Sequence, residues 1–175
     1  DRIESYDPSW PLPKLFRLKK GDKLNRAIFE GATINTPSMM ATEDYIASLE
    51  WAKSIGGLQG MHDRADANAK IMTDWIEATP WLRNMVDQPE LRTNTGVCFV
   101  FQGDFYDGLD DEAKASVPKK IAAMLEERDV AYDFNGYRDA PPSLRVWCGG
   151  TVEEEDLRRL QPWIEWAYAQ VKAEL

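Results

Sequence analysis

Tyr137-Arg138-Asp139-Ala140-Pro141-Pro142-Ser143-Leu144-Arg145-Val146-Trp147-Cys148 is the stretch of this chain that is most informative about its fold. Its last five residues, 144–148, are rich in branched and aromatic side chains and predict a strand. The strand is entered through a loop that two prolines stiffen. Arg138 and Arg145 flank that loop. An arginine at the start of a strand can present its planar fork to a carboxylate, although the same spacing also suits a surface salt bridge.

The segments around this strand predict a small α+β domain. We expect two further strands, at 96–101 and 130–134. Ser116 is expected to start a helix that runs to about Arg128. A capping box formed by Thr151 and Glu154 precedes a second helix, which Pro162 is expected to interrupt and kink. The order β-α-β-β-α is typical of a sheet with helices on one face.

The first half of the chain predicts two consecutive helices. The first is expected from Thr42, as its cap, to about residue 55, and the second over residues 61–78. A helix of about 20 residues spans about 30 Å, enough to bridge two domains. Before them lies Asn35-Thr36-Pro37, a pattern that fits any turn but whose hydroxyl and N–H groups also suit a phosphate. The basic run 14–23 is a solvated loop or a loop at a substrate or subunit interface.

Composition excludes several classes of function. The 175 residues carry a net charge of −9, which disfavours nucleic acid and anionic membranes as partners. No apolar run is long enough for a membrane-spanning helix, and the first residues do not resemble a signal peptide. Cys98 and Cys148 are expected to be free thiols, which fits a cytoplasmic protein. His62, the single histidine, is expected at the surface and supports neither a zinc site nor a Ser-His-Asp triad.

Several segments together resemble the phosphoserine aminotransferase family, in order and over essentially the whole chain. The resemblance is carried by Arg2–Lys14, Glu30–Ser38, Trp51–Leu58, Arg64–Asn68, Tyr132-Asp133, Tyr137–Pro141 and Leu144–Gly149. It implies the C-terminal portion of a fold-type-I transferase that depends on pyridoxal 5'-phosphate, an α/β protein with an α+β C-terminal small domain. Residues 1–75 would then be the remainder of the large cofactor domain with the interdomain helix, and residues 76–175 the small domain.

The resemblance also implies an activity. Members of this family transfer an amino group between glutamate and 3-phosphohydroxypyruvate, which gives phosphoserine and 2-oxoglutarate in serine biosynthesis. They are homodimers with active sites at the subunit interface. By position, Asn35 and Thr36 match the pair that reaches across the dimer to the cofactor phosphate. Arg145 matches the arginine that binds the substrate α-carboxylate, and Arg138 lies where the family has a histidine or arginine near the substrate phosphate.

One departure from the family concerns the catalytic lysine. The Schiff-base lysine is expected about 20 residues before the first residue of this chain, and none of the ten lysines present lies in a matching context. That lysine is both the covalent anchor of the cofactor and the expected proton shuttle. We therefore expect this polypeptide to be a fragment that does not catalyse transamination alone.

Two alternatives stay open from the sequence. One is another fold-type-I aminotransferase, of the serine–pyruvate or alanine–glyoxylate type, which would differ in having no need for extra positive charge near a substrate phosphate. The other is a dimerisation or binding fragment without catalysis.

Overall fold

The computed structural model describes residues 2–5 and 7–175, so Asp1 and Tyr6 of the opening segment lie outside the described residues. The chain divides into two compact units, Asp1–Glu50 and Trp51–Leu175. The boundary expected at 75/76 refers to the domains of a whole aminotransferase and stays a prediction.

Up to residue 38 the first unit consists of short elements. These are α1 (Arg2–Ser5), the 3₁₀ helices η1 (Lys14–Phe16) and η2 (Arg26–Phe29), and the strands β1 (Lys19–Lys20) and β2 (Lys23–Leu24). The strands pair antiparallel around Gly21, whose φ of 62° favours glycine at this turn. The basic run is therefore in part a hairpin rather than a plain loop.

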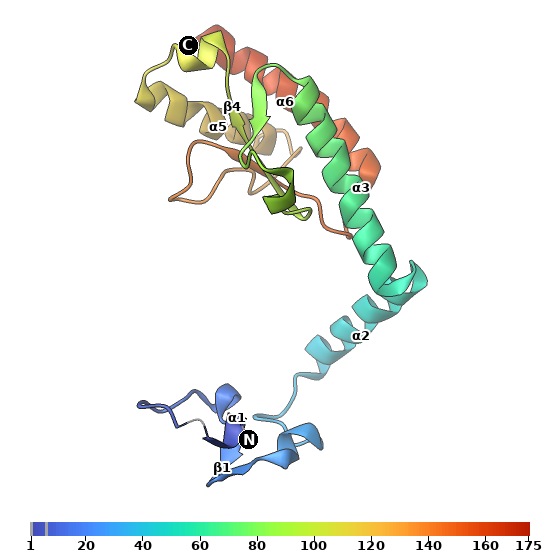
Figure 1. Ribbon diagram of the computed structural model, residues 1–175. Helices are drawn as coiled ribbons and strands as arrows, with labels where there is room; N and C mark the ends of the chain where they lie inside the picture. The colour runs from blue at the N-terminus through green and yellow to red at the C-terminus, as the bar shows by residue number, and fades with distance from the viewer. Residues whose placement is uncertain (1, 6) are drawn as a thin grey trace. The chain divides into compact units, whose positions relative to one another are not determined.

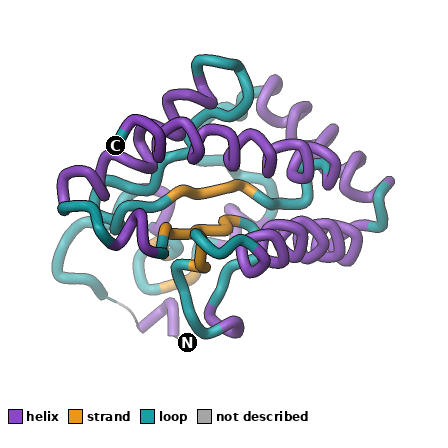
Figure 2. Tube along the Cα trace, turned by 90° about the horizontal axis from the view of Figure 1, so that it is seen from above, coloured by secondary structure: helices purple, strands orange, loops and turns teal. Residues whose placement is uncertain are grey.

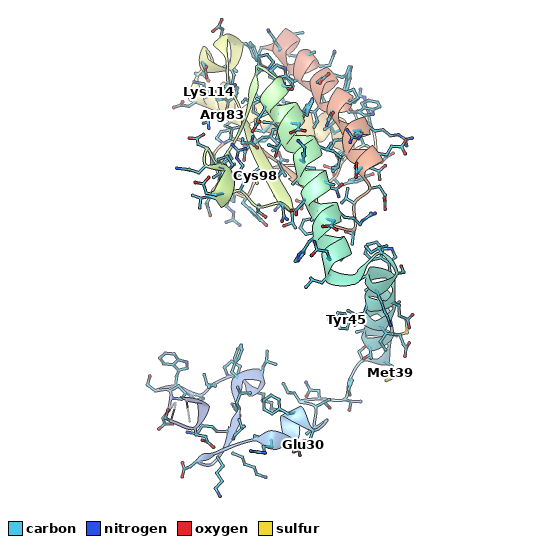
Figure 3. All side chains as sticks on the ribbon, turned by 45° about the vertical axis from the view of Figure 1, so that its right-hand side comes forward. Glu30, Met39, Tyr45, Arg83, Cys98 and Lys114 are labelled. Carbon is cyan, nitrogen blue, oxygen red and sulfur yellow. The ribbon has the colours of Figure 1, made fainter. Side chains whose placement is uncertain are left out.

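Helix α2 (Met39–Ser54) begins earlier than expected. Thr42 was expected to cap it, but that prediction is wrong. The cap is Ser38, whose Oγ accepts from the N–H of Ala41 at 3.3 Å, while Thr42 Oγ1 donates to the Ser38 carbonyl at 2.9 Å. None of its residues is buried, and Met39 and Tyr45 project from it (Figure 3).

The second unit begins at Trp51, and α3 (Gly57–Ala78) is its first complete helix. Gly56 and Gly57 have positive φ, as the expected break between two helices requires. The helix buries one face, at Ala65, Asn68, Ile71, Met72 and Ile76. The two predicted helices are thus confirmed, with bounds that differ by a few residues.

The sheet of this unit has three antiparallel strands in the order β3-β4-β5. They are β3 (Leu82–Asn84), β4 (Gly96–Phe101) and β5 (Leu144–Trp147). The strands expected at 96–101 and 144–148 are confirmed, whereas β3 was not expected. The strand predicted at 130–134 is wrong, because the chain turns there through Asp129 and Asp133, which have φ values of 55° and 52°. Only Asn135 makes an isolated bridge, to Leu144.

Two helices in addition to α3 pack with the sheet. They are α5 (Asp111–Glu126) and α6 (Glu154–Glu174), and Figures 1 and 2 show long helices alongside the strands. The chain also forms η3 (Pro89–Leu91) and α4 (Asp104–Asp107). The expected helix start at Ser116 is wrong, since the Asp110 side chain accepts from the N–H of Ala113 at 2.8 Å and caps α5.

The expected capping box at Thr151 is also wrong. Helix α6 begins at Glu154 with Glu153 at its cap position, and its backbone runs on through Pro162. A hydrogen bond of 3.0 Å from the Val152 N–H to the Gly149 carbonyl closes a turn, and this turn contains Thr151.

The core lies between one face of the sheet and the three helices. It is built from alternating strand residues and from the apolar helix stripes: Val97, Phe99, Phe101, Leu144, Val146, Met72, Ile76, Ile121, Leu125, Leu157, Ile164 and Val171. Trp81 stacks on Tyr168 with ring centroids 3.8 Å apart. Because strand side chains alternate, the opposite face carries Cys98 and Arg145.

Candidate functional site

Arg145 is held at the centre of β5. The strand register places it opposite Cys98, and its backbone N–H donates to the Phe134 carbonyl at 3.0 Å. Its neighbours Leu144 and Val146 are buried in the core, so the arginine side chain leaves the sheet on the other face. The strand therefore fixes the backbone position of Arg145 and the face of the sheet from which its side chain leaves.

Two side chains fix the position of the guanidinium group. Arg145 Nη2 donates to Asp133 Oδ2 at 2.7 Å, and the guanidinium carbon lies 4.4 Å from the centroid of the Tyr137 ring. An ion pair and a cation–π contact thus orient the fork. Its other N–H groups have no hydrogen-bond partner within the described residues, so the free edge can bind a planar anion such as a carboxylate.

A depression of about 780 Å³ lies beside this arginine. Its lining combines polar and apolar side chains, among them Thr95, Cys98, Tyr132, Asp133, Tyr137, Arg145 and Trp147. A concave site with a few polar groups is the usual form of a small-molecule site. The depression lies wholly in the second unit.

The pKa of the Cys98 thiol is affected by two features of this depression. Burial raises the pKa of its thiol, and the positive charge of Arg145 partly opposes that rise. Cys148, which is fully buried on the core side, has its pKa raised to about 11 by burial. Both thiols are free, as the sequence predicts.

Arg138 lies in the loop between Gly136 and Ser143 and is exposed. Within the described residues it makes no hydrogen bond or ion pair, so the structure places it in the loop that precedes β5 without linking it to Arg145. The loop is closed by the Gly136 N–H, which donates to the Ser143 carbonyl at 3.2 Å. The substrate-phosphate role expected for Arg138 stays a prediction.

Asn35 and Thr36 lie in the first unit, in an exposed loop before α2. Neither side chain makes a hydrogen bond within the described part of the chain. An amide and a hydroxyl with free donors fit a phosphate group. The cofactor role expected for Asn35 and Thr36 also stays a prediction.

Sequence reasoning gave no role to Asp133, although it lies within the stretch that carries the resemblance. The separation of twelve residues from Arg145 follows no helix or strand period, so no local pattern indicates the pair. His62 is exposed, as expected. No group of acidic, histidine or cysteine residues suited to a metal occurs among the residues described.

The chain was compared with known families, proteins and solved structures. No family model matches the chain. Over 171 residues, 98% of its length, the chain is 49% identical to the phosphoserine aminotransferase of Methanosarcina barkeri and 48% identical to that of Methanosarcina mazei. This chain is a homologue of phosphoserine aminotransferase. It spans 44% of the length of each of these curated relatives.

Solved phosphoserine aminotransferases share the fold. The structure from Bacillus circulans subsp. alkalophilus aligns with 91% of this chain and 39% of its own, at a TM-score of 0.70 and 19% identity. The structure from Trichomonas vaginalis, with pyridoxal phosphate bound, covers 79% of this chain and 36% of its own, at a TM-score of 0.63 and 21% identity. The expected fold class, part of a fold-type-I enzyme, is confirmed.

Among the described residues, no helix combines the length and the apolar character needed to cross a membrane.

Proposed function

We propose that this homologue is the part of a phosphoserine aminotransferase that recognises substrate and contributes to the cofactor site. The parent enzyme would transfer an amino group between glutamate and 3-phosphohydroxypyruvate, with phosphoserine and 2-oxoglutarate as the other pair. The single observation that supports this best is Arg145, an oriented arginine in a depression, at the position that the resemblance assigns to the substrate carboxylate.

Arg145 would bind the α-carboxylate shared by all four substrates and products. Each has a carboxylate next to the carbon that gains or loses the amino group, so one binding group serves both half-reactions. A planar guanidinium binds a carboxylate through two parallel N–H groups, which fixes the direction of the substrate as well as its affinity. This orientation would bring the reacting carbon to a constant position.

Arg138 would contribute the positive charge that a phosphorylated substrate needs. It is exposed and its loop begins at Gly136, within reach of solvent-borne anions. Serine–pyruvate and alanine–glyoxylate aminotransferases act on substrates without a phosphate, so this charge would set the preference for phosphoserine.

Asn35 and Thr36 would donate hydrogen bonds to the phosphate of pyridoxal 5'-phosphate in the partner subunit of a homodimer. When bound, this cofactor supplies the electron sink that transamination needs. Asn35 and Thr36 are the residues of this chain that we assign to the cofactor, at its phosphate. We infer no role in covalent attachment for any of the ten lysines, and we expect the chain by itself to lack transaminase activity.

Steady-state kinetics of the complete protein tests the proposal. Arg145→Gln should lower kcat/KM for glutamate and for phosphoserine by roughly 30- to 1000-fold, because removing one partner of a charged, hydrogen-bonded pair costs about 2–4 kcal/mol. Arg83→Gln is a suited control, since Arg83 is half exposed and pairs only weakly with Asp87, at 3.6 Å. Its kcat/KM should stay within about twofold of wild type.

Two results would contradict the proposal. One is an unchanged kcat/KM in Arg145→Gln. The other is a preference of the wild-type protein for alanine and glyoxylate over phosphoserine. The absence of the Schiff-base lysine from this chain has a separate test, in which the purified 175-residue protein is mixed with pyridoxal phosphate and treated with borohydride. A specific adduct at one lysine would refute that absence.

A further inference from the structure

Asp133 combines an unusual backbone with a charged contact to the candidate carboxylate site. Its φ is 52°, in the left-handed region that few residues other than glycine, asparagine and aspartate adopt. Its side chain is 87% exposed, yet it accepts from Arg145 Nη2 at 2.7 Å. An exposed side chain loses entropy when it is held in one geometry, so the contact needs a structural reason.

The neighbouring residue supplies that reason. Phe134 is buried, packs against Phe99 with ring centroids 6.4 Å apart, and accepts the Arg145 N–H through its carbonyl. Asn135 continues this edge by bridging to Leu144. The backbone of Asp133 is thus held in place by the buried Phe134 that follows it. Its left-handed conformation belongs to the turn that leads into the segment 134–135, which pairs with β5.

Tyr137 completes the arrangement from the loop. Its ring covers the Arg145 guanidinium, with the guanidinium carbon 4.4 Å from the ring centroid, although 74% of the tyrosine is exposed. The arginine is therefore held at one Nη by an acid and on its plane by an aromatic ring. Both contacts leave the other N–H groups of the fork available.

We infer that Asp133 is a positioning residue for the carboxylate-binding arginine, assisted by Tyr137. Holding the fork before substrate arrives removes the rotational freedom that the long arginine side chain would otherwise lose on binding. The ligand class is a 2-amino or 2-oxo acid, whose α-carboxylate meets the free edge of the fork. This inference rests on the proposed function of Arg145.

A graded set of variants separates charge from geometry. Asp133→Gly removes the side chain and relieves the left-handed backbone, so it carries no strain of its own. Asp133→Asn keeps the backbone preference and one acceptor oxygen but removes the charge. Asp129→Gly is the matched control, because Asp129 has a φ of 55° and contacts Tyr132 rather than the arginine.

The first readout is independent of catalysis. We expect the ¹⁵Nε order parameter of Arg145, measured in the 175-residue chain, to fall below about 0.6 in Asp133→Gly, to fall less in Asp133→Asn and to be unchanged in Asp129→Gly. Far-UV circular dichroism of each variant checks that the fold is kept. An order parameter in Asp133→Gly equal to that of wild type overturns the inference and leaves the proposed function untouched.

The second readout is the division between KM and kcat in the complete enzyme. Asp133→Gly should raise KM for glutamate by about 3- to 10-fold with kcat within about twofold, because the loss lies in binding rather than in the chemical step. A KM equal to wild type in a variant whose Arg145 is disordered overturns the inference. Failure of the proposed function shows differently, as an Arg145→Gln variant with unaltered KM and kcat.

Discussion

Replacing Asn68 with alanine should destabilise the second unit by about 2 kcal/mol. Asn68 is 1% exposed, and its Nδ2 donates to the carbonyls of Gly149 and Val152 at 3.2 and 2.9 Å. Each hydrogen bond contributes about 1 kcal/mol net. The cost stays near the sum of the two because both carbonyls keep a second donor, from Arg64 Nη2 for Val152 and from the Val152 N–H for Gly149.

A second substitution at the same site distinguishes lost bonds from an unfavourable charge. Asn68→Asp places carboxylate oxygens beside the two carbonyls and should be more destabilising than alanine near pH 7. Burial raises the folded-state pKa of the new carboxyl above its unfolded value of about 3.9. The stability deficit of this variant should therefore shrink as pH falls through that folded pKa toward the unfolded one, and grow as pH rises.

Urea unfolding followed by tryptophan fluorescence measures both effects, since Trp75 and Trp81 both belong to this unit and pack against its core. The midpoint should fall while the slope stays constant. Asn94→Ala is the control, because its hydrogen bond to Asp66 is exposed and its loss should cost below about 0.5 kcal/mol. Equal stabilities for Asn68→Ala and Asn94→Ala would refute the idea that Asn68 ties α3 to the turn after β5.

Three further outcomes are expected. Cys148, with its pKa near 11, should resist alkylation by iodoacetamide at pH 8 until urea unfolds the chain. The neutral thiol contributes fully to stability below about pH 8.5, its pKa in the unfolded chain, and this contribution should disappear as pH rises through 11. Cys148→Ala should flatten this dependence of the unfolding free energy on pH. Cys98 should be alkylated more slowly at pH 8 in Arg145→Gln than in wild type, because the guanidinium favours its thiolate, and equal rates would contradict this. Gly136→Ala should lower the unfolding free energy by about 1–3 kcal/mol, since its Cβ would lie 2.5 Å from Ser143 Oγ. Ser143→Ala removes a buried hydroxyl with no partner among the described residues, so alone it should leave the unfolding free energy nearly unchanged. It should also rescue the stability of Gly136→Ala. Additive losses of the two substitutions in a thermal melt would count against the contact between Gly136 and Ser143.

The two helices in the first half and the strands at 96–101 and 144–148 could be predicted because their signals are local. Apolar spacing of three and four residues, or runs of branched and aromatic residues, reflect the geometry of one element. The same kind of signal failed at Val130–Phe134. That run is apolar enough for a strand, but aspartates in the left-handed region at 129 and 133 turn the chain there.

Helix starts were less predictable than helices. Three were placed at the wrong residue, at Thr42, Ser116 and Thr151, each of which has a side chain that suits a cap. Ser38 and Asp110 are chemically equivalent caps that occur earlier in the chain. The choice between such candidates depends on where packing lets the first turn form, and that is a tertiary property.

The sequence by itself indicated the relationship to phosphoserine aminotransferase, because this depends on residue types in a fixed order, and the comparisons confirm it. The carboxylate role of Arg145 and the phosphate role of Asn35 and Thr36 stay predictions. The sequence also predicted the sheet with helices on one face. Only the tertiary structure decided the pairing of β3 with β4, the register that sets Arg145 opposite Cys98, and the contacts of Arg145 with Asp133 and Tyr137. These depend on how distant segments pack, and no period along the chain records them. The stretch 137–148 thus predicted its own strand from local residues. The contact of Arg145 with Asp133 could not be predicted in this way, because it depends on the packing of the neighbouring Phe134 in the core.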